Sequence, residues 1–342
     1  MKILNVAIIG CGNIFPMHAQ SIKEIENAKI VSVCDIKEER AKAKADQYKC
    51  NYYTDYKEML SKEDIDVVHI CLPHFLHAQV AIYASNLGKH ILTEKPMSIK
   101  LSDAEAMVKT AKDNKVTLGV IFQNRYNPGS RLIKDTLKSG ELGEILGGKL
   151  EVTWKRTDEY YSNSDWKGTW DMEGGGVIID QAIHTMDLMR WFVNSDIDYI
   201  DANISNRAHK IIQVEDSAEG VIKYKNGVVT AFHAINYYTY DAPVKIEIHC
   251  EKGMVNMVGD RADIKFKDGR ELIADNNPND TFDYGNGAKG YWGTSHTKQI
   301  KNYYASISAE LQPDIAGEDA IKTQKMICAI YESGRKRVRI KL

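Results

Sequence analysis

An aspartate and a histidine near the middle of the chain have the spacing with the clearest chemical meaning. Three glycines at 174–176 lead into an apolar run in which Asp180 and His184 lie four residues apart. On a helix this spacing places two side chains on one face, one above the other, and Asp187 extends the stripe. A carboxylate beside an imidazole can hold or move a proton near neutral pH. We interpret the pair as acid–base residues; the alternative is a buried helix with a capping aspartate and a core histidine.

Lys95 is a second residue suited to chemistry. It stands in Glu94-Lys95-Pro96, directly after a short apolar run. Proline favours an extended backbone for the residue before it, which would hold Lys95 at the end of a strand. An ammonium held there can donate a hydrogen bond or a proton to a reacting oxygen. The alternative is a surface lysine paired with Glu94.

A stretch dense in aromatic and polar side chains follows at 154–170. Aromatic rings pack against the C–H faces of sugars, and Arg and Asp side chains bind hydroxyl groups. The stretch therefore indicates a carbohydrate site, and the alternative is an interface loop or a small satellite core. Its residues of interest are Trp154, Arg156, Tyr160, Tyr161, Asp165, Trp166 and Trp170.

The elements that would position Lys95 begin with a nucleotide-binding pattern. Residues 3–9 are almost continuously apolar, as in a strand covered on both faces, and Gly10-Cys11-Gly12 follows. A helical stretch and a second strand, 30–33, come next. In this order Gly10 permits a tight turn and Gly12 permits close approach of a pyrophosphate to the helix N-terminus. Phe15 replaces the third glycine of the pattern, so we expect the turn to survive and the helix–strand packing to adjust.

An acidic residue closes the pattern at the end of the second strand. Asp35 stands where a carboxylate accepts hydrogen bonds from the ribose hydroxyls of NAD and repels the 2′-phosphate of NADP. We therefore predict NAD as cofactor, with NADP the less favoured choice. Lys37 and Arg40 keep NADP open, since both are close to Asp35 in the sequence.

Strands and helices continue to alternate up to residue 121, which predicts a doubly wound parallel sheet. Ligands of such sheets gather at the carboxyl ends of the strands. The residues expected to bind the cofactor are Gly10, Gly12, Asn13, Ile14, Asp35, Leu72, Pro73, His74, His77, Glu94, Lys95 and Gln123, together with Trp166.

The pattern changes after Gln123. Hairpin signals at Asn226-Gly227, Lys252-Gly253 and Asp268-Gly269 separate alternating runs, which indicates antiparallel strands. We expect the strand at 245–251 to pair with strands at 221–224 and 228–237. We also expect helices at 295–309 and 318–333, and a long loop at 274–293 that closes over a pocket or reaches a partner subunit.

The predicted domains are therefore residues 1–122, an α/β unit that binds NAD(P), and residues 123–342, an α+β unit for substrate binding and oligomerisation. The net charge of −2 with interspersed signs argues against binding nucleic acid or an anionic membrane. We find no apolar stretch long enough to span a bilayer. Six cysteines without paired spacing indicate free thiols in the cytoplasm, and no metal site.

The motifs, taken in order, resemble those of the glucose-fructose oxidoreductase, inositol dehydrogenase and MocA (Gfo/Idh/MocA) family over nearly the whole length. This resemblance implies an N-terminal Rossmann domain, a C-terminal domain with a large, mostly antiparallel open sheet, and homodimers or homotetramers formed through that sheet. It places Lys95, Asp180 and His184 in catalytic positions. We expect these three residues to bind the substrate together with Tyr126, Trp154 and Arg156. The matching motifs are Gly-Cys-Gly-Asn-Ile with His18, Cys34-Asp35, Pro73 with His77, Glu94-Lys95-Pro96, Gln123 with Arg125-Tyr126-Asn127-Pro128, and Gly174-Gly175-Gly176 with Asp180 and His184.

The function predicted from both arguments is hydride transfer between nicotinamide and a hydroxyl-bearing carbon of a sugar, sugar derivative or cyclic polyol. His184 would remove the hydroxyl proton, Lys95 would bind the same oxygen, and Asp180 would orient His184 or bind a neighbouring hydroxyl. Two alternatives stay open. One is a redox-neutral NAD-dependent glycoside hydrolase or lyase of the same family. The other is a non-catalytic nucleotide or sugar sensor.

Overall fold

The computed structural model describes residues 2–277 and 295–342, and its backbone divides into two compact units. Unit 1 comprises Met1–Gln123 with Asn279–Ile321, and unit 2 comprises Asn124–Pro278 with Lys322–Leu342. The predicted second domain, 123–342, is therefore interrupted, because the described part of Asn279–Ile321 packs with unit 1. Most of the loop predicted at 274–293 lies outside the described residues.

Unit 1 contains the parallel sheet that the alternating pattern predicts. Its six strands follow the order β3-β2-β1-β4-β5-β6, and all neighbours are parallel. The order reverses between β1 and β4, where sheets of this kind bind nucleotides. The strands are β1 Leu4–Ile9, β2 Ala28–Cys34, β3 Asn51–Tyr53, β4 Val67–Ile70, β5 His90–Thr93 and β6 Leu118–Val120. The helices are α1 Phe15–Lys23, α2 Glu38–Tyr48, α3 Tyr56–Lys62, α4 His74–Asn86, α5 Leu101–Asp113 and α9 Ser295–Ser308.

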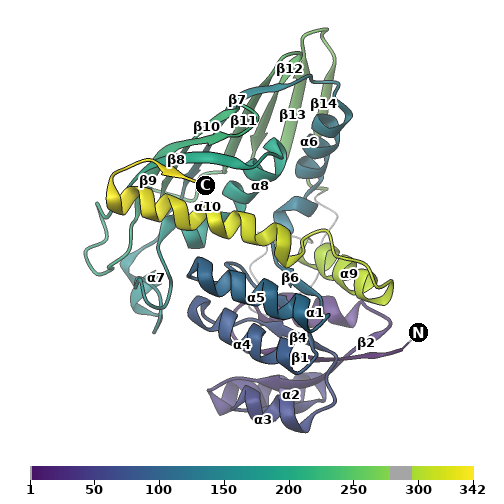
Figure 1. Ribbon diagram of the computed structural model, residues 1–342. Helices are drawn as coiled ribbons and strands as arrows, with labels where there is room; N and C mark the ends of the chain where they lie inside the picture. The colour runs from purple at the N-terminus through teal and green to yellow at the C-terminus, as the bar shows by residue number, and fades with distance from the viewer. Residues whose placement is uncertain (1, 278–294) are drawn as a thin grey trace. The chain divides into compact units, whose positions relative to one another are not determined.

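Helix α9 completes the core of unit 1, although it follows unit 2 in the sequence. It packs beside α1, and α4 packs beside α5 (Figure 1). Ile300, Tyr303 and Tyr304 of α9 belong to the same buried cluster as Val6 and Ile8 of β1. The hydrophobic effect therefore holds this late helix on the N-terminal sheet.

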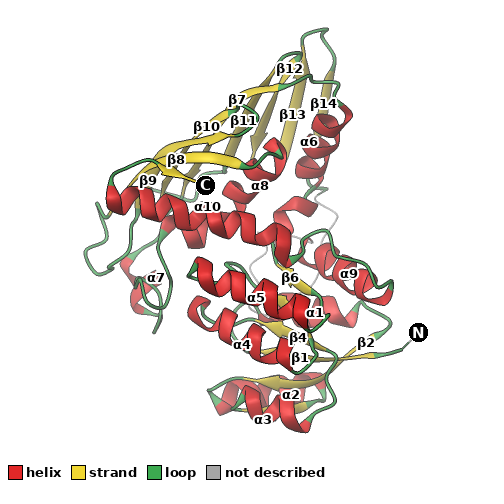
Figure 2. Cartoon of the chain, in the orientation of Figure 1, coloured by secondary structure: helices red, strands yellow, loops and turns green. Residues whose placement is uncertain are grey.

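Unit 2 is built on a nine-stranded sheet with the order β14-β13-β12-β11-β7-β10-β9-β8-β15 (Figure 2). Within the described residues β7 and β10 pair in parallel and the other neighbours are antiparallel. The strands are β7 Ile145–Thr153, β8 Ile197–Ser205, β9 Ser217–Tyr224, β10 Val229–Ile235, β11 Lys245–Cys250, β12 Gly253–Val258, β13 Arg261–Phe266, β14 Glu271–Ala274 and β15 Ile340–Lys341. The helices are α6 Pro128–Ser139, α7 Asp158–Ser162, a π-helix Val177–Ala182 and α8 Ile183–Val193. Helix α10, Gly317–Lys336, begins in unit 1 and ends in unit 2.

The three predicted hairpins are confirmed, whereas the predicted partners of β11 are wrong. Gly227 and Gly269 adopt φ angles of +95° and +91° in the turns after β9 and β13, a conformation that glycine adopts without strain. Strand β11 pairs with β12 and β7, not with β9 and β10. Strand β7, which comes earlier in the chain, lies between β11 and β10, and polar–apolar alternation carries no information about such a partner.

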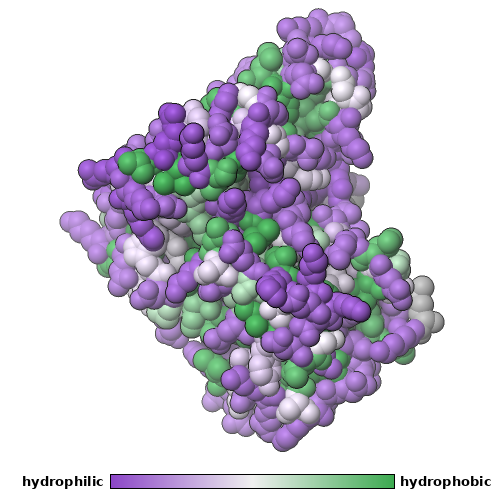
Figure 3. Space-filling view, in the orientation of Figure 1, coloured by the Kyte–Doolittle hydropathy of each residue, from purple (hydrophilic) through white to green (hydrophobic). Residues whose placement is uncertain are grey.

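Many side chains of the sheet alternate between buried and more exposed positions, and the exposed ones include both charged and apolar groups. Cross-strand ion pairs join Lys149 to Glu247 and Lys245 to Glu151, each at 3.4 Å. Hydrophilic side chains predominate on the face seen in Figure 3, with apolar groups scattered between them. No described helix combines the length and the apolar composition needed to cross a bilayer. All six cysteines are free thiols, and a cytoplasmic location stays a prediction.

Candidate functional site

The glycine turn after β1 has the geometry that a bound pyrophosphate requires. Gly10 has a φ of +100°, and a Cβ atom there would lie 2.2 Å from the carbonyl oxygen of Cys71. A Cβ on Gly12 would meet nothing within 4 Å, so the turn leaves open space beside bare backbone. Helix α1 begins immediately afterwards at Phe15, whose ring is fully buried. The unpaired N–H groups of a helix N-terminus attract phosphate oxygens.

Asp35 is held beside this turn by backbone hydrogen bonds. Its Oδ2 accepts from the N–H of Cys11, and its Oδ1 accepts from the N–H of Lys37, each at 2.9 Å. Gln123 follows β6, the edge strand farthest from β3 in the sheet. Its buried Oε1 has no hydrogen-bond partner among the described residues. A fixed carboxylate and a buried acceptor are groups that the hydroxyls and amide of a dinucleotide can satisfy. The residues present therefore fit a nicotinamide dinucleotide.

The turn that carries Lys95 is held by two buried side chains. The backbone N–H of Lys95 donates to Oε2 of Glu94 at 3.3 Å, and the Lys95–Pro96 peptide is cis. The ring of His77 is fully buried and lies 2.7 Å from the carbonyl oxygens of both Leu72 and Pro96. His77 thus joins the segment after β4 to the Lys95 turn and restricts the movement of the backbone next to Lys95.

The remaining cofactor candidates lie where the sequence places them, at the ends of strands. Asn13 is exposed in the glycine turn, and Ile14 is half-buried at the start of α1. Pro73 precedes α4, and His74 is its first residue. Trp166 differs from the others because it lies in unit 2. Direct contact of these residues with a cofactor stays a prediction.

The helix predicted around Asp180 is confirmed, with a wider first turn than expected. Val177–Ala182 forms a π-helix, and α8 continues from Ile183. Asp180 lies in the π-helix, and His184 is half-buried in the first turn of α8. Single π-turns of this kind concentrate at functional sites because they displace side chains from the regular helical positions.

Glu215 holds the glycines that precede this helix. Its carboxylate is buried and accepts hydrogen bonds from the N–H of Gly176 at 2.8 Å, the N–H of Ile178 at 3.0 Å and the hydroxyl of Tyr331 at 2.9 Å. A Cβ on Gly176 would lie 1.9 Å from the carbonyl oxygen of Glu215, and one on Gly175 would lie 2.0 Å from the Tyr331 hydroxyl. The glycines therefore serve the approach of Glu215 and Tyr331 to the helix.

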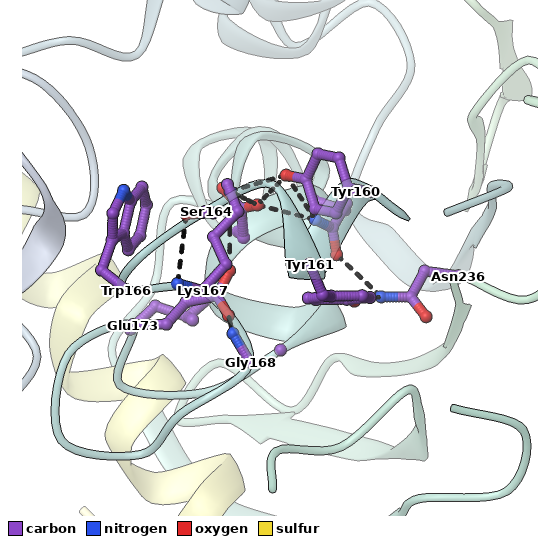
Figure 4. Close-up of polar contacts among 12 residues, drawn as sticks. Tyr160, Tyr161, Ser164, Trp166, Lys167, Gly168, Glu173 and Asn236 are labelled. Atoms are coloured by element: carbon purple, nitrogen blue, oxygen red, sulfur yellow. Dashed lines mark hydrogen bonds and ion pairs between the residues drawn. The ribbon is translucent and has the colours of Figure 1, made fainter. Parts of the chain in front are cut away.

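Asp180 accepts three hydrogen bonds at a single oxygen. Oδ2 receives Nζ of Lys167 at 2.7 Å, the hydroxyl of Tyr160 at 2.6 Å and Nε2 of Gln181 at 2.7 Å. Lys167 also donates to the Tyr160 hydroxyl at 2.6 Å, and Figure 4 shows both side chains within one bonded group. Burial alone would lower the pKa of Lys167, but the charge of Asp180 raises it above its usual value. Lys167 is therefore an ammonium that neutralises Asp180.

Asp187, which continues the helical spacing of Asp180 and His184, forms a buried ion pair. Its buried carboxylate binds the guanidinium of Arg125 through two contacts, at 2.7 and 2.6 Å, and the Thr323 hydroxyl at 2.6 Å. Burial would raise the pKa of Asp187, but Arg125 holds it below the usual value. Asp187 therefore ties α8 to α10 and to the segment before α6.

The three substrate candidates outside the helix are each held by neighbours within unit 2. Trp154 donates from Nε1 to the carbonyl oxygen of Ala242 at 3.1 Å. Arg156 stacks 5.0 Å from the Trp154 ring and donates to Asp241 at 2.9 Å. Tyr126 packs under the guanidinium of Arg131 at 4.4 Å. Their contact with a substrate stays a prediction.

In the hydrogen-bonded group around Asp180, the sequence pointed to Tyr160 but gave Lys167, Gln181 and Asn236 no role. Lys167 and Tyr160 lie in the aromatic stretch 154–170, so the density of that stretch was a usable signal. Gln181 accepts at Oε1 from Nδ2 of Asn236 at 3.1 Å, and Asn236 has no sequence signal of this role. Among residues 2–277 and 295–342 no group of three or more His, Cys, Asp or Glu side chains is placed to hold a metal ion.

Comparison with known protein families agrees with both units. Residues 4–122 match the model of an oxidoreductase family with an NAD-binding Rossmann fold, and residues 130–256 match the GFO/IDH/MocA C-terminal domain. The chain belongs to the Gfo/Idh/MocA family of oxidoreductases. The predicted fold class, an α/β Rossmann domain followed by an α+β domain with a large antiparallel sheet, is confirmed, and NAD is the cofactor of this family's fold.

Relatives of this Gfo/Idh/MocA chain include named dehydrogenases. The uncharacterized oxidoreductase YrbE of Bacillus subtilis is 26% identical over 336 residues, 97% of this chain and 94% of that protein. Inositol 2-dehydrogenase of Salmonella typhimurium is 25% identical over 259 residues, 74% of each chain. The chain also resembles the WlbA dehydrogenase from Bordetella pertussis, whose crystal structure was solved in complex with NADH and UDP-GlcNAcA. The two sequences are 27% identical and the structures match with a TM-score of 0.87, over 100% of this chain and 99% of that one.

Glu173 makes the stability of this oxidoreductase depend on pH. Its side chain is fully buried, and burial together with the Asp180 charge raises the pKa of Glu173 to about 8 from 4.5. Between these values the folded protein holds a proton that the unfolded chain has released, so this contribution to stability falls as pH rises through that window. We expect Glu173→Gln to gain thermal stability relative to wild type as pH rises from 5 to 9.

The measurement is the thermal unfolding midpoint of both proteins at pH 5, 7 and 9. Glu105→Gln is the matched control, because Glu105 is exposed on α5, and its midpoint should follow wild type at every pH. Parallel pH curves for wild type and Glu173→Gln would show that Glu173 keeps no extra proton in the folded protein.

Proposed function

We propose that the chain is an NAD-dependent dehydrogenase that oxidises a hydroxyl-bearing carbon of a sugar, sugar derivative or cyclic polyol. The observation that carries the proposal is the largely buried Asp180, held by Lys167, Tyr160 and Gln181 just before His184, in a chain with an NAD-binding unit. The names of the relatives, an inositol dehydrogenase and a dehydrogenase crystallised with a nucleotide sugar acid, support this substrate class.

NAD would be held by the glycine turn of Gly10 and Gly12 and by Asp35, and it would supply the hydride acceptor. The preference for NAD over NADP rests on Asp35, whose two oxygens already accept hydrogen bonds from Cys11 and Lys37. A 2′-phosphate beside this fixed carboxylate would be repelled, whereas ribose hydroxyls would be bound.

The chain's own groups would handle the proton. His184 takes the proton of the reacting hydroxyl, because an imidazole near neutral pH is an efficient general base. Lys95 donates a hydrogen bond to the same oxygen and stabilises its developing negative charge. Asp180 orients His184 or binds a neighbouring hydroxyl. The three donors to its Oδ2 leave the carboxylate little freedom to turn, which suits a positioning role.

Trp154, Arg156 and Tyr126 complete the proposal as groups that bind the sugar or polyol. Assembly as a homodimer or homotetramer through the exposed face of the nine-stranded sheet belongs to the same proposal. Charged pairs on this face, such as exposed Lys149 with the partly buried Glu247, support contacts with a second copy that are partly polar and sensitive to salt.

The test is reduction of NAD by the purified chain with a panel of sugars, sugar acids and inositols. We expect at least one compound to produce absorbance of reduced nicotinamide, and the same compound to raise the thermal midpoint when NAD is present. Product formation without net reduced nicotinamide would identify the redox-neutral hydrolase or lyase instead. Stabilisation by a sugar without any turnover across the panel would identify a sensor.

A further inference from the structure

A line of buried side chains runs through unit 1 behind Glu94 and has no part in the roles above. Nε2 of His18 lies 2.9 Å from Oε1 of Glu94, and Nδ1 of His18 lies 2.8 Å from Nδ1 of His69. Nε2 of His69 lies 2.9 Å from the Tyr304 hydroxyl. The four groups come from α1, the segment after β5, β4 and α9, and all four are buried.

The far end of the line determines where its protons lie. Among the described residues the Tyr304 hydroxyl has a single hydrogen-bond partner, Nε2 of His69. If His69 donated to Tyr304, the hydroxyl hydrogen would be buried without an acceptor, at a cost of about 1–3 kcal/mol. Tyr304 therefore donates, and Nε2 of His69 is the acceptor.

The remaining protons then follow one by one. Burial and the neighbouring His18 lower the pKa of His69 well below its usual value, so His69 is neutral and carries its proton on Nδ1. That N–H donates to Nδ1 of His18, which leaves Nε2 as the donor to Glu94. Burial would raise the pKa of Glu94, but His18 and His296 hold it well below its usual range, so Glu94 only accepts.

We propose that His18 is a positioning residue for Lys95. In one tautomer, selected by Tyr304 through His69, it holds Glu94 so that the second carboxylate oxygen binds the Lys95 amide. The same contact ties α1, the helix after the glycine turn, to the segment that carries Lys95. Nε2 of His296 lies 3.6 Å from Glu94 Oε1 and is a second imidazole facing this carboxylate. The proposal rests on the proposed function, in which Lys95 touches the substrate.

The line is suited to positioning and not to proton transport. Tyr304 is buried, and its hydroxyl has no second partner among the described residues, so a proton arriving there has no onward acceptor. The hydrogen bonds instead fix one ring orientation at each step. Errors of about 1 Å in the placement of a catalytic group cost about 10²-fold in rate. A buried network that fixes the position of Lys95 would therefore have a large effect on the rate.

The first experiment reads the tautomers directly and needs no substrate. In full-length protein with ¹⁵N-labelled histidine, long-range proton–nitrogen spectra at neutral pH should show His69 protonated at Nδ1 and His18 protonated at Nε2. Signals are assigned by their loss in His69→Gln and His18→Gln. Tyr304→Phe should bring a second tautomer of His69 into the spectrum. Tyr303→Phe is the matched control, because that hydroxyl donates to the carbonyl oxygen of Thr117 and lies outside the line.

The second experiment measures kcat and cofactor affinity separately, once a substrate is known. His18→Leu removes the donor to Glu94 and should lower kcat by about 10- to 100-fold, with the NADH dissociation constant within about threefold of wild type. His18→Gln keeps an N–H donor and should recover most of kcat. If His18→Leu does not fold, kcat of Tyr304→Phe is compared with Tyr303→Phe, and a loss of kcat confined to Tyr304→Phe is expected.

The outcomes separate this inference from the proposed function. His69 protonated at Nε2, or a doubly protonated His18, would overturn the inference whatever the chain catalyses. Equal loss of kcat in His18→Leu and His18→Gln would also overturn it. A chain without turnover on any substrate would end the proposed function, and the tautomer spectra would still decide the proton arrangement.

Discussion

Replacing Lys95 with methionine is expected to lower the turnover of NAD reduction by about 10³-fold, the size of effect produced by losing one donor to a developing oxyanion. Methionine keeps most of the volume of the side chain and removes its charge and its N–H donors. The Glu94 carboxylate would still accept the backbone N–H at residue 95, so the turn should keep its shape. The measurement is kcat with the best compound of the substrate panel, together with NADH affinity by fluorescence titration.

NADH affinity should change little in Lys95→Met, because the turn of Gly10 and Gly12 and the Asp35 carboxylate are untouched. Lys112→Met is the matched control, since Lys112 is exposed on α5, and it should retain wild-type turnover. Full activity in Lys95→Met would refute the assignment of Lys95 to the reacting oxygen, and lost activity together with lost NADH binding would reassign it to the cofactor.

Replacing Asp187 with leucine is expected to destabilise unit 2 by about 3–5 kcal/mol, the usual effect of removing one partner from a buried ion pair. Arg125 would keep its charge with only 3% of its side chain exposed, and the Thr323 hydroxyl would lose its acceptor. Denaturant unfolding, monitored by the tryptophan fluorescence of wild type and variant, measures this loss.

The double variant Arg125→Met with Asp187→Leu is the informative control. It removes both charges together, so its loss should be clearly smaller than that of Asp187→Leu alone. A single variant that unfolds like wild type, or a double variant that is less stable than the single one, would contradict the structural role given to Asp187.

The first unit was predictable because its signals are local. The signals lie within a few dozen residues and comprise Gly10, Gly12, Asp35 and the buried strands beside them. In a parallel α/β sheet each of these features has a known structural role. The neighbours of β11 and the place of α9 were not predictable in this way. Ile300, Tyr303 and Tyr304 indicate a helix with a buried face, but nothing in their spacing names the core that buries it.

The site shows the same limit at the level of single side chains. Asp180 and Asp187 have similar positions in the helical pattern, yet one meets Lys167 and Tyr160 while the other meets Arg125, 62 residues earlier. Tertiary folding decides which charge stands opposite each carboxylate, so spacing alone could not distinguish the surroundings of the two. The π-helix was also invisible, because its sequence is an ordinary apolar helical run.

The late position of α9 has a consequence for the order in which the protein matures. A nascent chain that has left the ribosome through residue 123 carries every strand of the first sheet but lacks Ile300, Tyr303 and Tyr304. The apolar surface that α9 covers in the finished protein therefore stays exposed while some 170 further residues are synthesised. Translation of the nucleotide-binding unit begins first, but its core is complete only after α9 has been synthesised. Because the unit consists of two separate chain segments, cleavage at one peptide bond cannot separate it whole from the other unit.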